Sequence, residues 1–197
     1  MKKLSAGKVV FLLLMVSACK SAEIENEWCV PKGFLAPSNF VSGNNQDPNY
    51  DEPEQGGGPT LLFPAEYLSD RVSGYQAEIE SSSGGVLKQP MHVSISSETF
   101  RATGFDSSQA WKLTEKVPLY SNSSKTEFGW DVFAINGSDE STFWGQCYDD
   151  FEGGFTCMRT LAVGDDYLTY NVEEENVHLY EDIDNFLTMK VSEWRCK

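Results

Sequence analysis

The stretch from 128 to 172, FGWDVFAINGSDESTFWGQCYDDFEGGFTCMRTLAVGDDYLTYNV, carries the strongest structural signal in the chain. It is rich in aromatic and β-branched residues, and short runs of Gly, Asn and Asp interrupt it at regular spacing. These two features are typical of strands joined by tight turns. We therefore predict an antiparallel meander with strands at 128–135, 142–148, 155–163 and 167–172.

After this meander the apolar residues recur at the spacing of a helix and no longer at that of a strand. Asp182 can cap the start of a helix, and an apolar stripe at helical spacing follows it, made of Ile183, Phe186, Leu187, Val191 and Trp194. A helix with one apolar stripe needs a surface that buries it, so we expect this helix to pack on the sheet. The predicted fold class is mainly β, or α+β: one domain with an antiparallel β meander or sandwich and a C-terminal helix packed on the sheet.

The signals upstream of the meander are weaker. Two strands are expected at 72–80 and 86–96, and a short helix at 106–116 with Asp106 as its cap. Residues 42–59 have no periodicity and few apolar side chains. Because such a run cannot offset its ordering entropy by burial, we predict a long, mobile surface loop there.

The first residues are typical of a secretory signal. Lys2, Lys3 and Lys8 supply the positive charge, and eight consecutive apolar residues follow at 9–16. That run is too short to cross a bilayer as a helix. We therefore exclude residues 1–18 from the fold.

The end of this signal, Val16-Ser17-Ala18-Cys19, resembles the bacterial lipobox, in which a peptidase cuts before a cysteine that then carries acyl chains. The resemblance covers about a tenth of the chain. It implies that Cys19 is lipidated and that residues 1–18 are a lipoprotein signal peptide. The alternative is an ordinary signal peptide that is cut near Ala18 or Ala22 and leaves Cys19 as an odd thiol.

The same resemblance implies where in the cell the protein is located. Residues 19–28 become a lipid-anchored tether for a single domain at 29–197, and several acyl chains on one cysteine hold a protein on a bilayer. Lys20 stands where the inner-membrane retention signal of the family has Asp. This favours the periplasmic face of the outer membrane, and anchoring to the inner membrane stays open.

Four cysteines remain beyond Cys19, and an even number in an oxidising compartment predicts two disulfides with three possible connectivities. Cys147 and Cys157 flank a turn-rich stretch, and pairing 148 with 156 places them opposite each other on a hairpin. Cys29 and Cys196 are then left to join the two ends of the domain. A zinc site is the alternative, although the chain has no Cys-x2-Cys pair.

The charge of the chain excludes one class of function and suggests another. Thirty Asp and Glu against fifteen Lys and Arg leave a formal charge of −15, which argues against a nucleic-acid binder. Between Glu127 and Asp184 there are fifteen acids and one base, Arg159. The meander is therefore expected to be the acidic half of the molecule.

The meander also predicts where these acids gather. Alternate loops of an up-and-down meander share an end, so the loop at 149–154 is expected beside residues 173–176. The predicted partner-binding residues are Asp149, Asp150, Phe151, Glu152, Glu173, Glu174 and Glu175. Such a surface would steer and hold a basic protein, with the aromatic residue as an anchor. The other interpretation is that the charge serves solubility alone.

The sequence contains no Gly-x-Ser-x-Gly, His-Glu-x-x-His or phosphate-binding glycine motif. His92 and His178 lie among apolar neighbours, and we interpret both as structural or surface residues. The runs at 149–153 and 181–184 offer oxygen ligands but lack the spacing of a calcium-binding EF-hand. We predict no catalytic residue, no metal and no cofactor, although spacing alone cannot test a pair of catalytic carboxylates.

These observations predict a lipid-anchored periplasmic binding protein, not an enzyme, that neutralises a secreted toxin or hydrolase of the cell envelope by occluding its active site. It is similar in general type to lipoprotein immunity proteins, and more distantly to lipoprotein lysozyme inhibitors. The similarity rests on anchor, size, acidity and disulfides, and no motif is shared. The expected partners are one basic protein and, through the acyl chains, the membrane. The alternatives are an envelope-assembly lipoprotein and a carboxylate-based glycan hydrolase.

Overall fold

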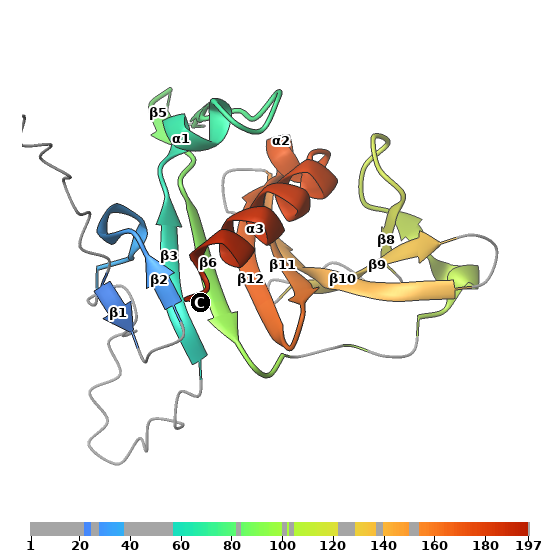
Figure 1. Cartoon of the computed structure of the whole chain (residues 1–197). Helices are drawn as coiled ribbons and strands as arrows, with labels where there is room; N and C mark the ends of the chain where they lie inside the picture. The colour runs from blue at the N-terminus through green and yellow to red at the C-terminus, as the bar shows by residue number, and fades with distance from the viewer. Residues whose placement is uncertain are drawn as a thin grey trace, which may run out of the picture.

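The large sheet dominates the fold. The computed structural model describes residues 22–24, 28–37, 57–81, 84–99, 102, 105–121, 129–136, 140–149 and 154–196. Eight antiparallel strands of this part form one sheet, and two strand pairs form small separate sheets (Figure 1). Helix α3 (Tyr180–Trp194) packs on the large sheet. The fold is mainly β with a C-terminal helix on the sheet, as the sequence predicted.

The meander predicted at 128–172 is confirmed. Each of its strands pairs antiparallel with the next: β9 (Trp130–Asn136), β10 (Glu140–Asp149), β11 (Phe155–Val163) and β12 (Asp166–Glu173). In the β10–β11 hairpin Cys147 lies opposite Cys157, the register that the turn-rich stretch indicated. The structure places the sulfur atoms of both predicted pairs, Cys147–Cys157 and Cys29–Cys196, at disulfide-bonding distance.

Strands that precede the meander in the sequence extend it on both sides. On one side β6 (Met91–Ser96) pairs with β12, and β3 (Gly57–Phe63) pairs with β6. On the other side β8 (Leu119–Ser121) pairs with β9, and β7 (Trp111–Lys112) pairs with β8. The order across the sheet is β3-β6-β12-β11-β10-β9-β8-β7.

The strand predicted at 72–80 is largely wrong. A short helix, α1 (Ala65–Ser69), precedes it, and the amide of Val72 donates to the carbonyl of Leu68 at 2.8 Å, which continues the helical turn. Extended structure is confined to β4 (Glu78–Glu80). Val72 is buried in the core, so its apolar side chain packs from a turn and not from a strand.

The strand predicted at 86–96 is broken into two. β5 (Val86–Lys88) pairs with β4 in a small hairpin, whereas β6 belongs to the large sheet. The break falls at Gln89-Pro90. The amide of Gln89 donates to the carbonyl of Ala77 at 2.8 Å, and Pro90 has no N–H for a strand ladder.

The helix predicted at 106–116 is a single turn of 3-10 helix, η3 (Ser107–Gln109). Asp106 caps it as expected, because its carboxylate accepts from the amide of Ser108 at 2.9 Å. The chain then turns into β7, and the amide of Leu113 donates to the carbonyl of Leu119 at 2.8 Å. Hairpin pairing with β8 therefore overrides the local helix signal.

The N-terminal boundaries also differ from the prediction. β3 begins at Gly57, inside the loop predicted at 42–59, and residues 42–56 lie outside the described part. In the predicted tether, β1 (Ala22–Ile24) pairs with β2 (Trp28–Val30). A 3-10 turn, η1 (Lys32–Phe34), follows β2.

The C-terminal helix buries the predicted stripe. Ile183, Phe186, Leu187, Val191 and Trp194 all lie in the hydrophobic core. The helix begins at Tyr180, after the short helix α2 (Glu174–Val177), so Asp182 lies in the first turn and is not the cap. A carboxylate in the first turn is still favourable for the helix dipole.

A bulge in β10 places the Trp144 ring against Tyr180 of α3, with the ring centroids 5.7 Å apart. Phe143 pairs with Phe133 and Gly145 with Val132, so Trp144 is the extra residue, and it is buried. The carbonyl of Trp144 accepts from the Arg159 guanidinium at 2.7 Å. At Gly145 a Cβ would lie 2.3 Å from a backbone oxygen of β11, so glycine is required there.

Arg159 and Asp184 form a largely buried ion pair between β11 and α3. The guanidinium donates to the Asp184 carboxylate at 2.9 Å, and the Tyr170 hydroxyl donates to the other carboxylate oxygen at 2.7 Å. The two charged side chains are 13% and 15% exposed. Burial and the adjacent Asp184 carboxylate raise the pKa of Tyr170 well above its usual value, which keeps this hydroxyl a donor.

We predict that Asp184→Ala destabilises the fold by about 3–5 kcal/mol, because it leaves the Arg159 charge buried and unpaired. The measurement is the free energy of unfolding in urea, followed by tryptophan fluorescence. Glu193→Ala is the matched control, since it removes the exposed partner of Lys190 on the same helix. It should cost less than about 1 kcal/mol. Equal losses in the two variants would refute a special role for the Arg159–Asp184 pair.

Candidate functional site

The ends of β10 and β12 place several acids at one end of the meander. Asp149 is the last residue of β10, Glu173 is the last of β12, and α2 begins with Glu174 and Glu175. We call these four residues the acidic end. Asp150, Phe151 and Glu152, which complete the predicted partner-binding set, lie outside the described residues.

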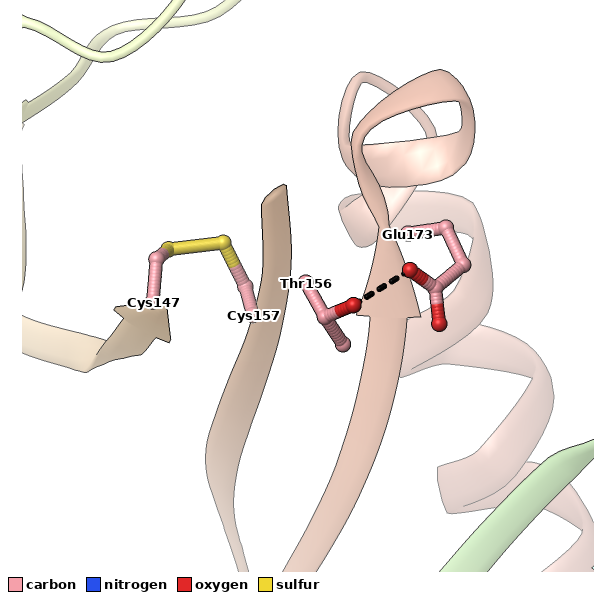
Figure 2. Close-up of a disulfide and its surroundings, with 4 residues drawn as sticks. All are labelled: Cys147, Thr156, Cys157 and Glu173. Carbon is pink, nitrogen blue, oxygen red and sulfur yellow. Dashed lines mark hydrogen bonds between the residues drawn. A yellow bond between two sulfur atoms is a disulfide. The ribbon is translucent and has the colours of Figure 1, made fainter. Parts of the chain in front are cut away.

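A row of side chains crosses the sheet at the acidic end. Tyr148 on β10 lies opposite Thr156 on β11, and Thr156 lies opposite Glu173 on β12. The Thr156 hydroxyl donates to the Glu173 carboxylate, and the Cys147–Cys157 disulfide joins the neighbouring positions of β10 and β11 (Figure 2). The Glu173 carboxylate is thereby held by the strand beside it.

The charge of Glu173 acts on two tyrosines. Burial first, and then the Glu173 carboxylate, raise the pKa of Tyr148 above its usual value. The same two causes raise the pKa of Tyr75, whose hydroxyl donates to the carbonyl of Gln89 at 2.8 Å. The charge of Glu173 thus acts on tyrosines in two separate segments of the chain.

Helix α2, which carries Glu174 and Glu175, is hydrogen-bonded to another segment of the chain. Asn176 is buried, and its side-chain amide accepts from the Gln76 N–H at 2.8 Å and donates to the Gln76 carbonyl at 3.1 Å. This pair of bonds fastens α2 to the segment that follows α1. Sequence reasoning missed Asn176, because nothing local distinguishes it from the polar residues around it. A surface that is held in this way loses little conformational entropy when it binds.

The one base of the acidic half does not offset these charges at the surface. The Arg159 side chain is only 13% exposed, and it donates hydrogen bonds to Asp184 of α3 and to the carbonyls of Trp144 and Thr160. In the part of the chain that the structure describes, no ion pair involves Asp149, Glu174 or Glu175. The negative charge of these three residues is therefore not offset by an ion pair among the described residues.

The N-terminal connection enters the domain at the opposite end of β12. Trp28 forms a β-bridge with Arg195, and the Arg195 guanidinium pairs with Asp166, the first residue of β12. Glu173 is the last residue of this eight-residue strand. At about 3.3 Å per residue the two ends lie about 23 Å apart. Glu173 therefore lies at the other end of β12 from the place where Trp28 of β2 meets the C-terminal segment.

The described residues offer few other features from which a function could be proposed. Within the described ranges no group of three His, Cys, Asp or Glu could hold a metal ion. Asp184, from the second acidic run considered for calcium, is bound by Arg159 and Tyr170. No helix there is both long and apolar enough to span a membrane. His92 is half-buried in β6, and His178 follows α2 with its Nδ1 buried.

Comparison with known proteins identifies no relative. No protein-family model matches the chain, and no curated protein and no solved structure matches it significantly. The geometry and charge of the residues themselves are the basis for a functional proposal.

We predict that Glu173→Gln lowers the pKa of both Tyr148 and Tyr75, because a phenolate forms more easily once the neighbouring negative charge is gone. The measurement is an alkaline titration of ¹³C-labelled tyrosines by NMR. Tyr180 serves as an internal control: burial and Glu181 raise its pKa to about 12, and Glu173 is not among the causes. Unchanged titration of Tyr148 and Tyr75 would contradict a field centred on Glu173.

Proposed function

We propose that this chain is a lipid-anchored binding protein that neutralises a secreted toxin or hydrolase by docking its acidic end over a basic active-site surface. The observation that carries the proposal is the acidic end itself: carboxylates on fixed elements, in a half of the molecule whose single base is buried. Occlusion needs no catalytic group in this protein. It needs a rigid, negative surface that fits a positive cleft.

Electrostatics would act mainly on the rate of association. Fields of one sign steer an oppositely charged partner and raise its rate of encounter, and salt screens this effect. Affinity then depends on apolar and aromatic anchors at the centre of the contact. Tyr148 is 38% exposed and lies in the same row as Glu173, so it is the described aromatic residue best placed for this role.

The position of the tether suits this function. If Cys19 carries acyl chains, the membrane lies on the side of the domain where Trp28 pairs with Arg195. The acidic end is about 23 Å away along β12 and would face the aqueous space, where a secreted partner arrives. The same charge disfavours contact with anionic lipid, which keeps the acidic end off the bilayer.

The proposed place is the periplasmic face of the outer membrane. The lipobox-like segment and Lys20 support it, and disulfides persist in that oxidising compartment. One basic secreted protein and the membrane are the proposed partners.

The test is affinity purification of a tagged protein from cells that carry its genomic neighbourhood, with elution by salt. We predict recovery of one basic secreted enzyme that is inactive while bound. Asp149→Lys combined with Glu174→Lys should slow its association at least about tenfold. The matched control is Glu80→Lys with Glu115→Lys, which makes the same change in net charge at exposed positions outside the acidic end and should have a much smaller effect.

Three outcomes would overturn the proposal. An equal effect of both double variants would mean that net charge, and not the acidic end, governs binding. Recovery of envelope-assembly proteins alone would favour a structural lipoprotein. Hydrolysis of cell-wall glycan by the purified protein, lost on changing one carboxylate, would favour an enzyme.

A further inference from the structure

The face of the large sheet opposite α3 contains a hollow of about 190 Å³. Strand alternation explains which side chains line it. Arg159 and Tyr170 point toward α3, so their neighbours Met158, Thr160 and Thr169 point to the other face. The full lining is Glu98, Thr99, Phe143, Gln146, Met158, Thr160 and Thr169.

The hollow combines an apolar surface with a single charged group. Phe143 and Met158 supply the apolar surface, and Met158 is 36% exposed. Glu98 supplies the charge, and no ion pair in the described part of the chain involves it. The Ser96 hydroxyl donates to the backbone carbonyl of Glu98 at 2.6 Å, which fixes the segment that carries the carboxylate.

The size and polarity of the hollow suit one long basic side chain. Pockets for drug-sized ligands occupy about 300–1,000 Å³, so this hollow is too small for such a molecule. Lysine and arginine place an aliphatic stem on apolar surface and keep a cationic head beside polar groups. Phe143 and Met158 would take the stem, and Glu98 would take the head.

The hollow also lies close to Glu173, on the same face of the sheet. The row Tyr148–Thr156–Glu173 lies two residues along the strands from the row Gln146–Met158–Asn171, a distance of about 7 Å. A protein that covers the acidic end therefore reaches the hollow without a second docking event.

We infer that this hollow receives one lysine or arginine side chain of the basic partner, with Glu98 as its counter-charge and Met158 and Phe143 as its apolar wall. This inference rests on the proposed function for the identity of the partner. The chemistry of the hollow can be tested without that partner.

The probe is Nα-acetyl-lysine methylamide, titrated into protein labelled at the methionine methyl groups and followed by NMR. Met158 lies in the hollow, whereas Met189 is 57% exposed on α3 and serves as an internal control. We expect a saturable shift of the Met158 methyl signal and none at Met189. The norleucine analogue, which keeps the stem and lacks the charge, should give no saturable shift at the same concentrations.

Glu98→Gln should weaken binding of the lysine probe about fivefold, the upper range for a partly exposed ion pair. Glu115→Gln, an exposed acid outside the hollow, should leave it unchanged. The inference is overturned by an absent Met158 shift, by an equal shift with the norleucine analogue, or by equal affinities of wild type and Glu98→Gln.

The two proposals can fail separately. If the lysine probe binds as expected but no basic protein is recovered from cells, the hollow stands and the proposed function fails. If a basic partner is recovered and Glu98→Gln leaves its dissociation rate unchanged, the inhibitor role stands and the hollow is not part of its interface.

Discussion

The buried ion pair between Arg159 and Asp184 determines how the two layers of this protein meet. A guanidinium and a carboxylate are costly to remove from water, and the cost is offset only when the remaining donors and acceptors are also bonded. Here the Trp144 and Thr160 carbonyls and the Tyr170 hydroxyl meet most of that demand. The pair therefore selects one placement of α3 on the sheet, since a shift of one helical turn would leave both charges buried and unpaired.

The same ion pair explains the unequal charge of the surface. Arg159 is the one base among fifteen acids between Glu127 and Asp184, and its pairing with Asp184 of α3 leaves its side chain only 13% exposed. In the described part of the chain, Asp149, Glu174 and Glu175 then take part in no ion pair. Their mutual repulsion opposes folding, and two features resist it: the Cys147–Cys157 disulfide and the Asn176 amide that holds α2.

Sequence patterns predicted the meander because each of its strands carries its own signal. In β12 the alternating residues Leu168, Tyr170 and Val172 are buried, and Gly164 provides a left-handed backbone in the turn before it. In the residues before the meander, the local sequence pattern and the pairing of distant segments disagree. The sequence around Gly58 predicts a loop. A Cβ at this position would lie 3.0 Å from Ile95 and Trp28, so this glycine is needed for close packing in β3. Asp106 is a true cap, but pairing with β8 limits its helix to one turn.

The candidate site also has one part that the sequence predicted and one part that it did not. That Asp149 and Glu173 share an end follows from the connectivity of the meander alone. The hollow could not be foreseen, because Glu98 comes from the segment after β6 and meets β10, β11 and β12 only through the order of strands in the sheet. Long-range charge attracts every basic protein in much the same way and so gives little discrimination. A hollow that accepts one side chain at a fixed distance from the acidic end binds only those partners that carry a lysine or arginine at the matching position. A surface of this kind gains its rate of association from the acidic end and its specificity from short-range fit.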